Sequence, residues 1–515
     1  AVYIFKTQQF LKGAEIDKQT SQNEVTETGM WASEPVPFDP MELALHESYA
    51  RHADHDERPG YKMIHEYPLS EQPPMMTHIF ENAEGNRIIA AKGAPEQIMN
   101  VSGLGADDQG SIKEKINKLA SQGFRVLAVA RAKFDGNSFP EDQTKFPFVF
   151  LGLLAFYDPP KENIEEVFNH FYDAGISVKI ITGDNPITAS AIAQQCGMRS
   201  ADLTLDGKEL IEMTDAELNR ATDKVNIFTR MFPEAKLRII NSLKEKGHIV
   251  AMTGDGVNDS LALKSSHIGI AMGKKGSEVA RQAASLILTD DDLSHMVEAI
   301  ALGRRIYENL KKAIQYIISI HIPIILIVTI PLLLFWKYTN IFSPVHVIFL
   351  ELIMGPTCSI IFENEPIEPN SMKKPPRTMS DNFFSFHELS LSIFQGLIIT
   401  VACLGIGYYY MENNYSEGEV RTIIYSTLIF SNIFLTLSNR SFYYSIFTTI
   451  QYKNVLIPII LTVSLLVLLF SIFFRPLREI FQFVKLDLTE LSVSLAAAFA
   501  GVMWIELYKL FKRKK

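Results

Sequence analysis

The stretch Thr253-Gly-Asp-Gly-Val-Asn-Asp-Ser-Leu261 follows the apolar run His248 to Met252 and is the segment that decides the fold. It places two carboxylates, Asp255 and Asp259, with two glycines on a predicted strand-to-helix turn. Such a turn is suited to holding Mg²⁺ beside a phosphoryl group. Taken alone, the same residues are equally compatible with an ordinary tight turn and helix start.

A second turn of the same kind precedes the first. The β-like run Ile176-Ser-Val-Lys-Ile-Ile181 ends in Thr182-Gly183-Asp184-Asn185-Pro186, and the helix-prone segment Ile187 to Cys196 follows. In an open α/β sheet, ligands bind at the carboxyl ends of the strands, where helix N-termini present N–H groups to anions. Between the turns lies Arg230-Met-Phe-Pro-Glu-Ala-Lys236, which can supply a cation for the same phosphate. Together these segments predict a phosphoryl-transfer site.

Three further motifs occur along the chain, and their order is informative. Lys92-Gly-Ala-Pro-Glu96 and Gly123-Phe-Arg-Val-Leu-Ala128 come first, and Asp158-Pro159-Pro160 follows the predicted strand Phe148 to Phe156. With the two Thr-Gly-Asp turns, this series resembles the haloacid dehalogenase-like phosphotransferases and, more narrowly, the P-type cation-transporting ATPases of the calcium-pump-like group. The resemblance covers essentially the whole chain. It implies ATP-driven cation transport with ATP and Mg²⁺ as cofactors.

The predicted fold class is an α/β cytoplasmic part followed by an α-helical membrane domain. Residues 1–145 mix short strands and helices and are expected to form a partial nucleotide-binding domain. Residues 146–300 alternate strand and helix, which predicts a doubly wound phosphorylation domain. Residues 301–312 are predicted to form a polar helical stalk that leads into the membrane domain, 313–515.

Long apolar runs crowd the C-terminal part and predict an integral membrane protein. Each run has about 17–25 mainly apolar residues, enough to cross a bilayer as a helix, although any single one is also compatible with a buried core helix. The six predicted spans are 313–336, 342–362, 388–411, 422–438, 454–474 and 488–510.

Charges beside these spans predict their orientation. Lys373, Lys374 and Arg377 lie between the second and third spans, whereas Glu412 and Glu417 lie between the third and fourth. By the positive-inside rule, the soluble domains and the C-terminus are cytoplasmic, and we expect a plasma (inner) membrane location. The net charge of −9 comes without a basic patch, so no nucleic-acid partner is expected, and three cysteines make no disulfide framework.

The resemblance also implies roles in phosphoryl transfer, residue by residue. Asp255 is expected to bind Mg²⁺, with Asp259 as a second candidate ligand, while Asn258 and Asp259 shape the turn. The residues expected to contact the phosphoryl oxygens are Thr182, Gly183 and Lys236. The residues expected to dock the nucleotide-binding domain are Asp184 and Arg230.

For ATP, the resemblance points to Glu42 in Asp39-Pro-Met-Glu-Leu-Ala-Leu45 as the carboxylate that meets adenine. Lys92 and Gly93 would border the purine, and Arg125 would reach the phosphates. The alternative for Glu42 is a solvated helix face, and the alternative for Arg125 is a surface salt bridge.

The largest departure from the family is an absence. P-type pumps form an aspartyl phosphate on an Asp-Lys-Thr-Gly-Thr motif, and this sequence contains no such string. We therefore expect the chain to be the C-terminal portion of a longer pump, with the nucleophile and actuator domain in a missing N-terminal half. Two alternatives stay open: a non-catalytic ATP- and ion-binding subunit of a split pump, and a membrane-anchored haloacid dehalogenase-like phosphohydrolase. The latter needs a strand that ends in Asp-x-Asp, and no predicted strand before Thr182 ends in this way.

Ionisable residues inside the spans are candidate ligands of the transported cation, because burying a charge in hydrocarbon is costly. Glu351 comes first, since Gly355-Pro356 beyond it can break the helix and free carbonyl oxygens. His321 and Asn432 come next, although His321 is equally suited to a structural hydrogen bond. One carboxylate favours a single monovalent or divalent cation, with proton counter-transport as an option, over two Ca²⁺ ions, and the ion itself stays open.

Overall fold

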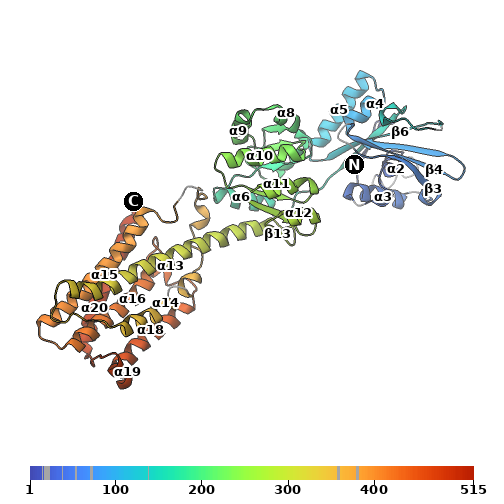
Figure 1. Cartoon of the computed structure of the whole chain (residues 1–515). Coiled ribbons are helices and arrows are strands. Elements are labelled where there is room, and N and C mark those ends of the chain that lie inside the picture. The colour runs from blue at the N-terminus through green and yellow to red at the C-terminus, as the bar shows by residue number, and fades with distance from the viewer. Residues whose placement is uncertain are drawn as a thin grey trace. The chain divides into compact units, whose positions relative to one another are not determined.

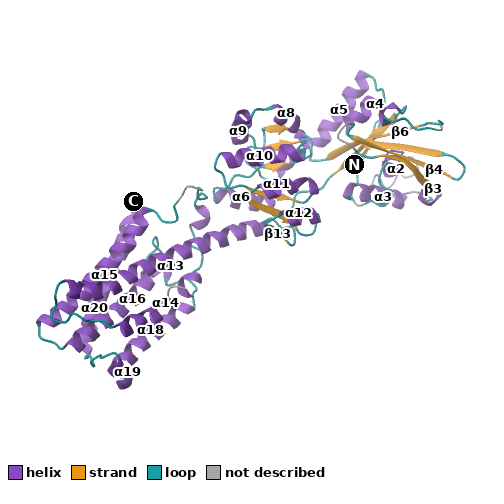
Figure 2. Cartoon of the chain, in the orientation of Figure 1, coloured by secondary structure: helices purple, strands orange, loops and turns teal. Residues whose placement is uncertain are grey.

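The computed structural model describes every residue except 14–15, 17–23, 38, 53–54, 70–72, 137, 357–359, 379–381 and 515. Its contacts divide the chain into two compact units, Ala1–Tyr172 with Ile176–Ser294, and Asp173–Gly175 with His295–Lys515. Figure 1 follows the chain through both units, and Figure 2 shows that the described strands belong to the first unit and that the second is helical.

A seven-stranded antiparallel sheet forms the N-terminal part of the first unit, with the strand order β2-β1-β7-β6-β5-β4-β3. Its strands are β1 (Val2–Ile4), β2 (Gln9–Leu11), β3 (Tyr61–Tyr67), β4 (Met75–Asn82), β5 (Arg87–Gly93), β6 (Arg125–Ala132) and β7 (Val149–Phe156). Helices cover both faces: α2 (Glu24–Trp31) and α3 (Pro40–His52) on one, α4 (Pro95–Val101) and α5 (Ala106–Ala120) on the other.

Strand β7 corrects one predicted boundary. The sequence assigned it to the phosphorylation domain that was expected to begin at residue 146, yet it pairs with β1 and β6 in the antiparallel sheet. Leu153 packs into the core under α4 and α5, and Leu154 packs into the core under α2 and α3. Because successive side chains of a strand alternate between faces, this apolar strand is buried on both sides only in the middle of a covered sheet.

The second part of the first unit holds parallel strands and helices, as predicted, but in two sheets. One has the order β8-β10-β9 and the other β11-β12-β13. Their strands are β8 (Ile180–Ile181), β9 (Thr204–Asp206), β10 (Ile227–Thr229), β11 (Ala251–Gly254), β12 (Ile268–Met272) and β13 (Leu286–Leu288). The helices around them are α6 (Ile164–Asp173), α7 (Pro186–Gln195), α8 (Gly207–Glu212), α9 (Asp215–Lys224), α10 (Pro233–Glu245), α11 (Ser260–Ser265) and α12 (Glu278–Ala283).

The predicted single doubly wound sheet is therefore interrupted between β8 and β11. Within the described residues, β8 pairs only with β10, and β11 pairs only with β12. Ile181 of β8 nevertheless packs against the core that contains Met252 of β11. The two unpaired strand edges thus share one hydrophobic core without sharing backbone hydrogen bonds.

The second unit is built from long helices: α13 (Ser294–Leu333), α14 (Pro344–Pro356), α15 (Phe386–Glu412), α16 (Glu417–Ser438), α18 (Leu456–Phe473) and α20 (Leu488–Lys514). Helix α13 runs without a break through the predicted stalk and first span, although Pro323 and Pro331 lie inside it. Helix α16 packs against α15, α18 and α20 and is the most buried of the apolar helices.

Five helices are long and apolar enough to cross a membrane: Ser294–Leu333, Phe386–Glu412, Glu417–Ser438, Leu456–Phe473 and Leu488–Phe511. They correspond to five of the six predicted spans. The remaining prediction, 342–362, contains the shorter apolar helix Pro344–Gly355, and its residues 357–359 lie outside the described part of the chain. Five candidate spans make this chain a membrane protein.

Candidate functional site

The turn after β11 is held together by Asp259. Lys236, from α10, donates a hydrogen bond to Asp259 Oδ1 at 2.7 Å, and the Gly256 N–H donates to Oδ2 at 3.2 Å. Both side chains of the ion pair are largely buried. A Cβ atom at Gly254 would lie 2.6 Å from the Asp259 Cβ, so only glycine allows this close approach. The carboxylate of Asp259 is therefore committed to the turn itself.

Asp255 is in the opposite situation. Its backbone oxygen accepts a hydrogen bond from Ser277 N–H at 2.7 Å, but its carboxylate has no hydrogen-bond or ion-pair partner among the described residues and is exposed. Asn258 is exposed on the same turn. An exposed carboxylate fits Mg²⁺, which takes one or two carboxylates and keeps water ligands. The geometry thus favours Asp255 over Asp259 as the metal ligand.

The turn after β8 is closed by its own polar atoms. The Asp184 N–H donates to Thr182 Oγ1 at 3.1 Å, and the Thr182 hydroxyl donates to Asp184 Oδ2 at 3.2 Å. Asn185 then caps α7 by accepting the Thr188 N–H at 3.0 Å, with Pro186 in the first turn. Gly183 is exposed at the tip. The N-terminus of α7 is therefore capped by residues of the turn itself.

Arg230 packs beside this turn. Its N–H donates to the Asp184 carbonyl at 3.0 Å, and its guanidinium lies 3.4 Å from Asp206 and 3.9 Å from Glu96. Its φ of 51° lies in the left-handed region, where a non-glycine residue is uncommon and often functional. Among the described residues, no hydrogen bond or ion pair joins the Thr182 turn to the Asp255 turn, so their link is the shared core at Ile181.

The predicted nucleotide residues Glu42 and Lys92 form a buried ion pair. Lys92 Nζ lies 2.6 Å from Glu42 Oε1 and donates to Ser33 Oγ at 2.7 Å. Burial lowers the pKa of Lys92. Glu42 Oε2 is buried and has no hydrogen-bond partner among the residues that the structure describes. Glu42 is therefore not on a solvated helix face, and it offers a free acceptor atom.

Gly93 and Arg125 have different surroundings. A Cβ at Gly93 would lie 2.5 Å from the Pro74 carbonyl oxygen, which makes glycine necessary there. Arg125 lies four residues from Val129, the strand partner of Lys92, which corresponds to roughly 13 Å along β6. Its Nε lies 3.5 Å from Asp184 Oδ1 instead. The structure thus brings Arg125 to the Thr182 turn and not to the Lys92–Glu42 pair.

Two of the three predicted cation ligands come together in the second unit. His321 Nε2 lies 3.0 Å from Glu351 Oε1, and both side chains are roughly half exposed. Asn432 is buried on α16, where its side-chain oxygen accepts a hydrogen bond from the Tyr316 hydroxyl. Asn432 therefore links α16 to α13 through this hydrogen bond.

Several buried charges in this unit were missed by sequence reasoning. Arg440 Nε lies 3.1 Å from Glu365 Oε1, which also accepts from Asn454 at 2.8 Å, and Lys312 Nζ lies 2.8 Å from Glu368 Oε1. All four charged side chains are buried. They lie outside the apolar runs, so the search for charges within spans could not find them. All four lie within a few residues of the end of a predicted span.

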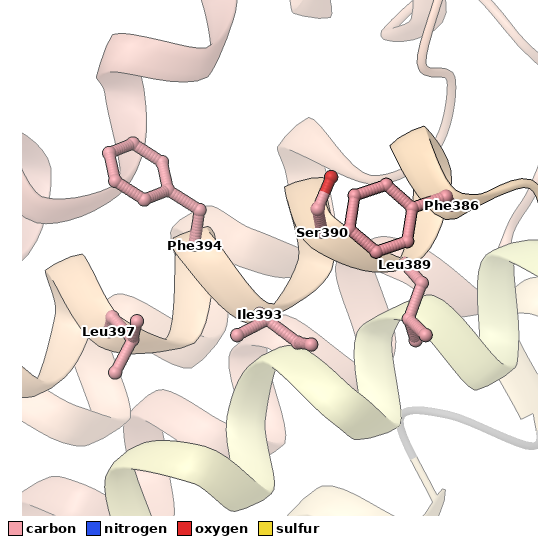
Figure 3. A pocket seen from close by; sticks show the side chains of 6 residues that line it. All are labelled: Phe386, Leu389, Ser390, Ile393, Phe394 and Leu397. Carbon is pink, nitrogen blue, oxygen red and sulfur yellow. The ribbon is translucent and has the colours of Figure 1, made fainter.

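A shallow apolar recess runs along α15. Its lining side chains come from one stretch of that helix, as Figure 3 shows: Phe386, Leu389, Ser390, Ile393, Phe394 and Leu397. Phe386 and Phe394 are largely exposed. On a candidate membrane-spanning helix, such a surface is suited to contact with lipid chains. It holds none of the predicted site residues.

Two protein-family models match this chain. Residues 74–267 match the haloacid dehalogenase-like hydrolases, and residues 339–511 match the C-terminal region of cation-transporting ATPases. The first match contains both Thr-Gly-Asp turns and Lys236, and the second contains most of the second unit.

The chain is also similar to calcium-transporting ATPases from distant organisms. It is 31% identical to calcium-transporting ATPase 1 of Saccharomyces cerevisiae over 92% of this chain and 52% of the relative. It is 31% identical to the calcium-transporting ATPase of Bacillus subtilis over 83% of this chain and 49% of the relative, and 29% identical to the human calcium-transporting ATPase type 2C member 1 over 87% and 49%. The chain spans about half the length of the curated relatives it matches. With its motifs in the family order, this chain belongs to the P-type cation ATPases of the calcium-pump-like group.

Proposed function

We propose that this chain serves in ATP-driven transport of a cation across a membrane, with the turn after β11 as the metal-binding half of the phosphorylation site. The observation that carries the proposal is the contrast between Asp259, which is locked by Lys236 and the Gly256 N–H, and Asp255, whose exposed carboxylate is free. Asp255 would hold Mg²⁺, which neutralises charge on the phosphoryl oxygens when bound. Thr182, Gly183 and Lys236 would contact those oxygens.

Lys92 and Glu42 support ATP binding in the N-terminal sheet. The unpartnered Glu42 Oε2 can accept a hydrogen bond from the exocyclic amine of adenine, while Lys92 stays paired with Oε1. Arg125 and Arg230 would hold this sheet against the Thr182 turn through Asp184 and Glu96. This arrangement would bring the bound nucleotide toward the turns.

The two unpaired strand edges support a nucleophile from sequence outside this chain. A parallel strand between β8 and β11 would complete one doubly wound sheet, and its carboxyl end would lie between the two Thr-Gly-Asp turns. An aspartate at that end would be placed to attack the terminal phosphoryl group of ATP. The missing N-terminal half of the pump would be its source.

In the membrane, we propose six spans, with α14 as part of the second, and a plasma (inner) membrane location with the soluble domains and C-terminus cytoplasmic. Glu351 and His321 would be the first candidate ligands of the transported cation, since they already lie 3.0 Å apart. Ca²⁺ is the first cation to test, because the relatives are calcium-transporting ATPases.

The test is Asp255→Asn in the full-length pump. Removing the carboxylate charge should reduce phosphoenzyme formation from labelled ATP by at least about 10²-fold, as loss of a group that stabilises developing charge does. Nucleotide binding should be unchanged. Asp202→Asn, an exposed aspartate away from the turns, is the matched control. Normal phosphorylation of Asp255→Asn would overturn the metal assignment.

The split-subunit alternative makes a different genetic prediction. An in-frame Asp-Lys-Thr-Gly-Thr within some tens of codons upstream of Ala1 supports a single long pump. A start codon with a ribosome-binding site there supports a subunit whose nucleophile is on a separate chain.

A further inference from the structure

Three potential metal ligands meet near one end of the N-terminal sheet: Glu34, Glu66 and His78. One ligand atom from each side chain lies within 4.8 Å of the others. They come from separate segments, because Glu34 follows α2, Glu66 lies in β3 and His78 lies in β4. None of the three belongs to the phosphoryl-transfer site described above.

A register shift between β3 and β4 brings Glu66 opposite His78. Met63 pairs with Phe80, but His65 pairs with Ile79, so one extra residue is accommodated between Met63 and His65. As a result Glu66 stands directly opposite His78, whereas the unshifted register would place it opposite Thr77. Irregularities of this kind re-aim side chains and are frequent beside functional sites.

His78 is oriented as a ligand. The side chain is fully buried, and its Nδ1 lies 3.0 Å from the Ser33 carbonyl oxygen. A carbonyl oxygen only accepts, so Nδ1 carries the proton and Nε2 presents a lone pair. Within the described part of the chain, Nε2 is buried without a hydrogen-bond partner, and Glu66 Oε1 lies 4.0 Å from it. Metal-binding histidines typically donate their other ring N–H to a backbone carbonyl in this way.

The charges around His78 also favour a cation. Burial lowers the pKa of His78, which keeps the imidazole in the neutral form that metals require. The nearby Lys92 ammonium is paired directly with Glu42 at 2.6 Å and also interacts electrostatically with Glu34, so two carboxylates and one lysine surround His78. A buried nitrogen lone pair that accepts no hydrogen bond raises the free energy of the folded state, and two carboxylates lie next to it. One divalent cation would satisfy all three groups at once.

We propose that Glu34, Glu66 and His78 bind a transition-metal dication such as Zn²⁺, Co²⁺ or Mn²⁺. A mixed set of one imidazole and two carboxylates suits these ions, whereas Mg²⁺ and Ca²⁺ take oxygen ligands alone. Glu34 and Glu66 are only partly buried, so their side chains can rotate inward to close the remaining distance, and water can complete the coordination. The site lies one residue from Ser33 Oγ, which accepts a hydrogen bond from Lys92.

The test is a Co²⁺ titration of the complete chain, purified in detergent and stripped of metals with a chelator, because Co²⁺ absorption reports its ligands directly. The wild type should show a Co²⁺ absorption band that Zn²⁺ displaces. His78→Gln should weaken Co²⁺ binding by at least about tenfold, since even loss of an outer-shell partner costs 10–100-fold. Glu66→Gln, which keeps the shape of the side chain, should weaken it as well.

Two controls make the result decisive. His65→Gln replaces an exposed histidine on the same strand as Glu66 and should leave the band unchanged. Asp255→Asn should also leave it unchanged, which separates this site from the proposed Mg²⁺ site. If His78→Gln does not fold, as judged by circular dichroism, Glu66→Gln decides. Wild-type affinity and spectrum in the folded variants, or equal loss in His65→Gln, would overturn the proposal.

Discussion

The turn after β11 and the interior of the second unit both place an acid against a cation, but they use the charge differently. Lys236 and Asp259 are 23 residues apart and leave the neighbouring Asp255 exposed. Arg440 and Glu365 are 75 residues apart, with side chains 3% and 0% exposed. The Lys236–Asp259 pair stabilises a turn that exposes the carboxylate of Asp255. The Arg440–Glu365 pair is buried, so neither charge is accessible to solvent. The paired acids Asp259 and Glu365 therefore stabilise the fold, whereas the exposed Asp255 is the candidate metal ligand.

The buried pair gives the strongest test of this contrast. Arg440→Met should reduce the free energy of unfolding by about 3–5 kcal/mol, because it leaves Glu365 buried and unpaired. Denaturant titration of the detergent-solubilised chain measures this change. Arg475→Met, which breaks an exposed ion pair with Glu479, should have no measurable effect. Equal effects of the two variants would contradict the distinction between buried and exposed ion pairs.

The pair in the turn should matter less for stability. Lys236→Met should reduce the free energy of unfolding by about 1.5–3 kcal/mol, the range for a hydrogen bond to a charged group. In the full-length pump it should also reduce phosphoenzyme formation. Lys208→Met, at an exposed lysine, is the control for both measurements. A loss as large as that of Arg440→Met would contradict the comparison.

The close approach of Gly254 to Asp259 can be tested without changing a charge. Gly254→Ala should cost about 1–3 kcal/mol, because its Cβ would lie 2.6 Å from the Asp259 Cβ. Gly110→Ala, inside helix α5, has open space around its Cβ and should instead stabilise by roughly 0.5–1 kcal/mol. Thermal unfolding of both variants gives the comparison. A neutral Gly254→Ala would mean that Asp259 is free to move.

The half-exposed pair on α13 and α14 should affect function without affecting stability. Glu351→Gln keeps the size of the side chain and removes only its charge, so the fold of α13 and α14 should be retained. In the full-length pump it should abolish the cation dependence of ATP hydrolysis across Ca²⁺, Mn²⁺, Na⁺ and K⁺. Glu412→Gln at the end of α15 is the control. Unaltered cation dependence would exclude Glu351 as a ligand.

The smallest expected effect is a pH dependence at Asp292. The backbone N–H of Ser294, and then the Asn163 side chain, lower the pKa of Asp292 to about 2. The folded pKa is depressed, so this stabilisation is complete above the ordinary pKa near 4 and is lost as the pH falls toward 2. Unfolding of wild type and Asp292→Asn, followed from pH 5 to pH 2, should converge in acid. A constant difference across that range would contradict the assignment.

Local features of the sequence predicted the two Thr-Gly-Asp turns and most of the candidate spans. Asn185 and Pro186 start α7 through contacts within four residues, so the predicted helix after the Thr182 turn is confirmed. Gly254 and Asp259 are close in sequence and fix the second turn together. Apolar runs of membrane length gave five candidate spans, because crossing a bilayer constrains length and composition alone.

Tertiary structure decided what depends on partners far along the chain. It placed β7 in the first sheet, left β8 and β11 with open edges, and joined Glu365 to Arg440. It also set Glu66 opposite His78 through a one-residue register shift. Strand pairing and burial of charge are settled by packing between distant segments, and no window of the sequence contains that information. Short stretches of sequence therefore carry the motifs and the family likeness, whereas packing between distant segments settles which charged side chains are buried in ion pairs and which stay exposed.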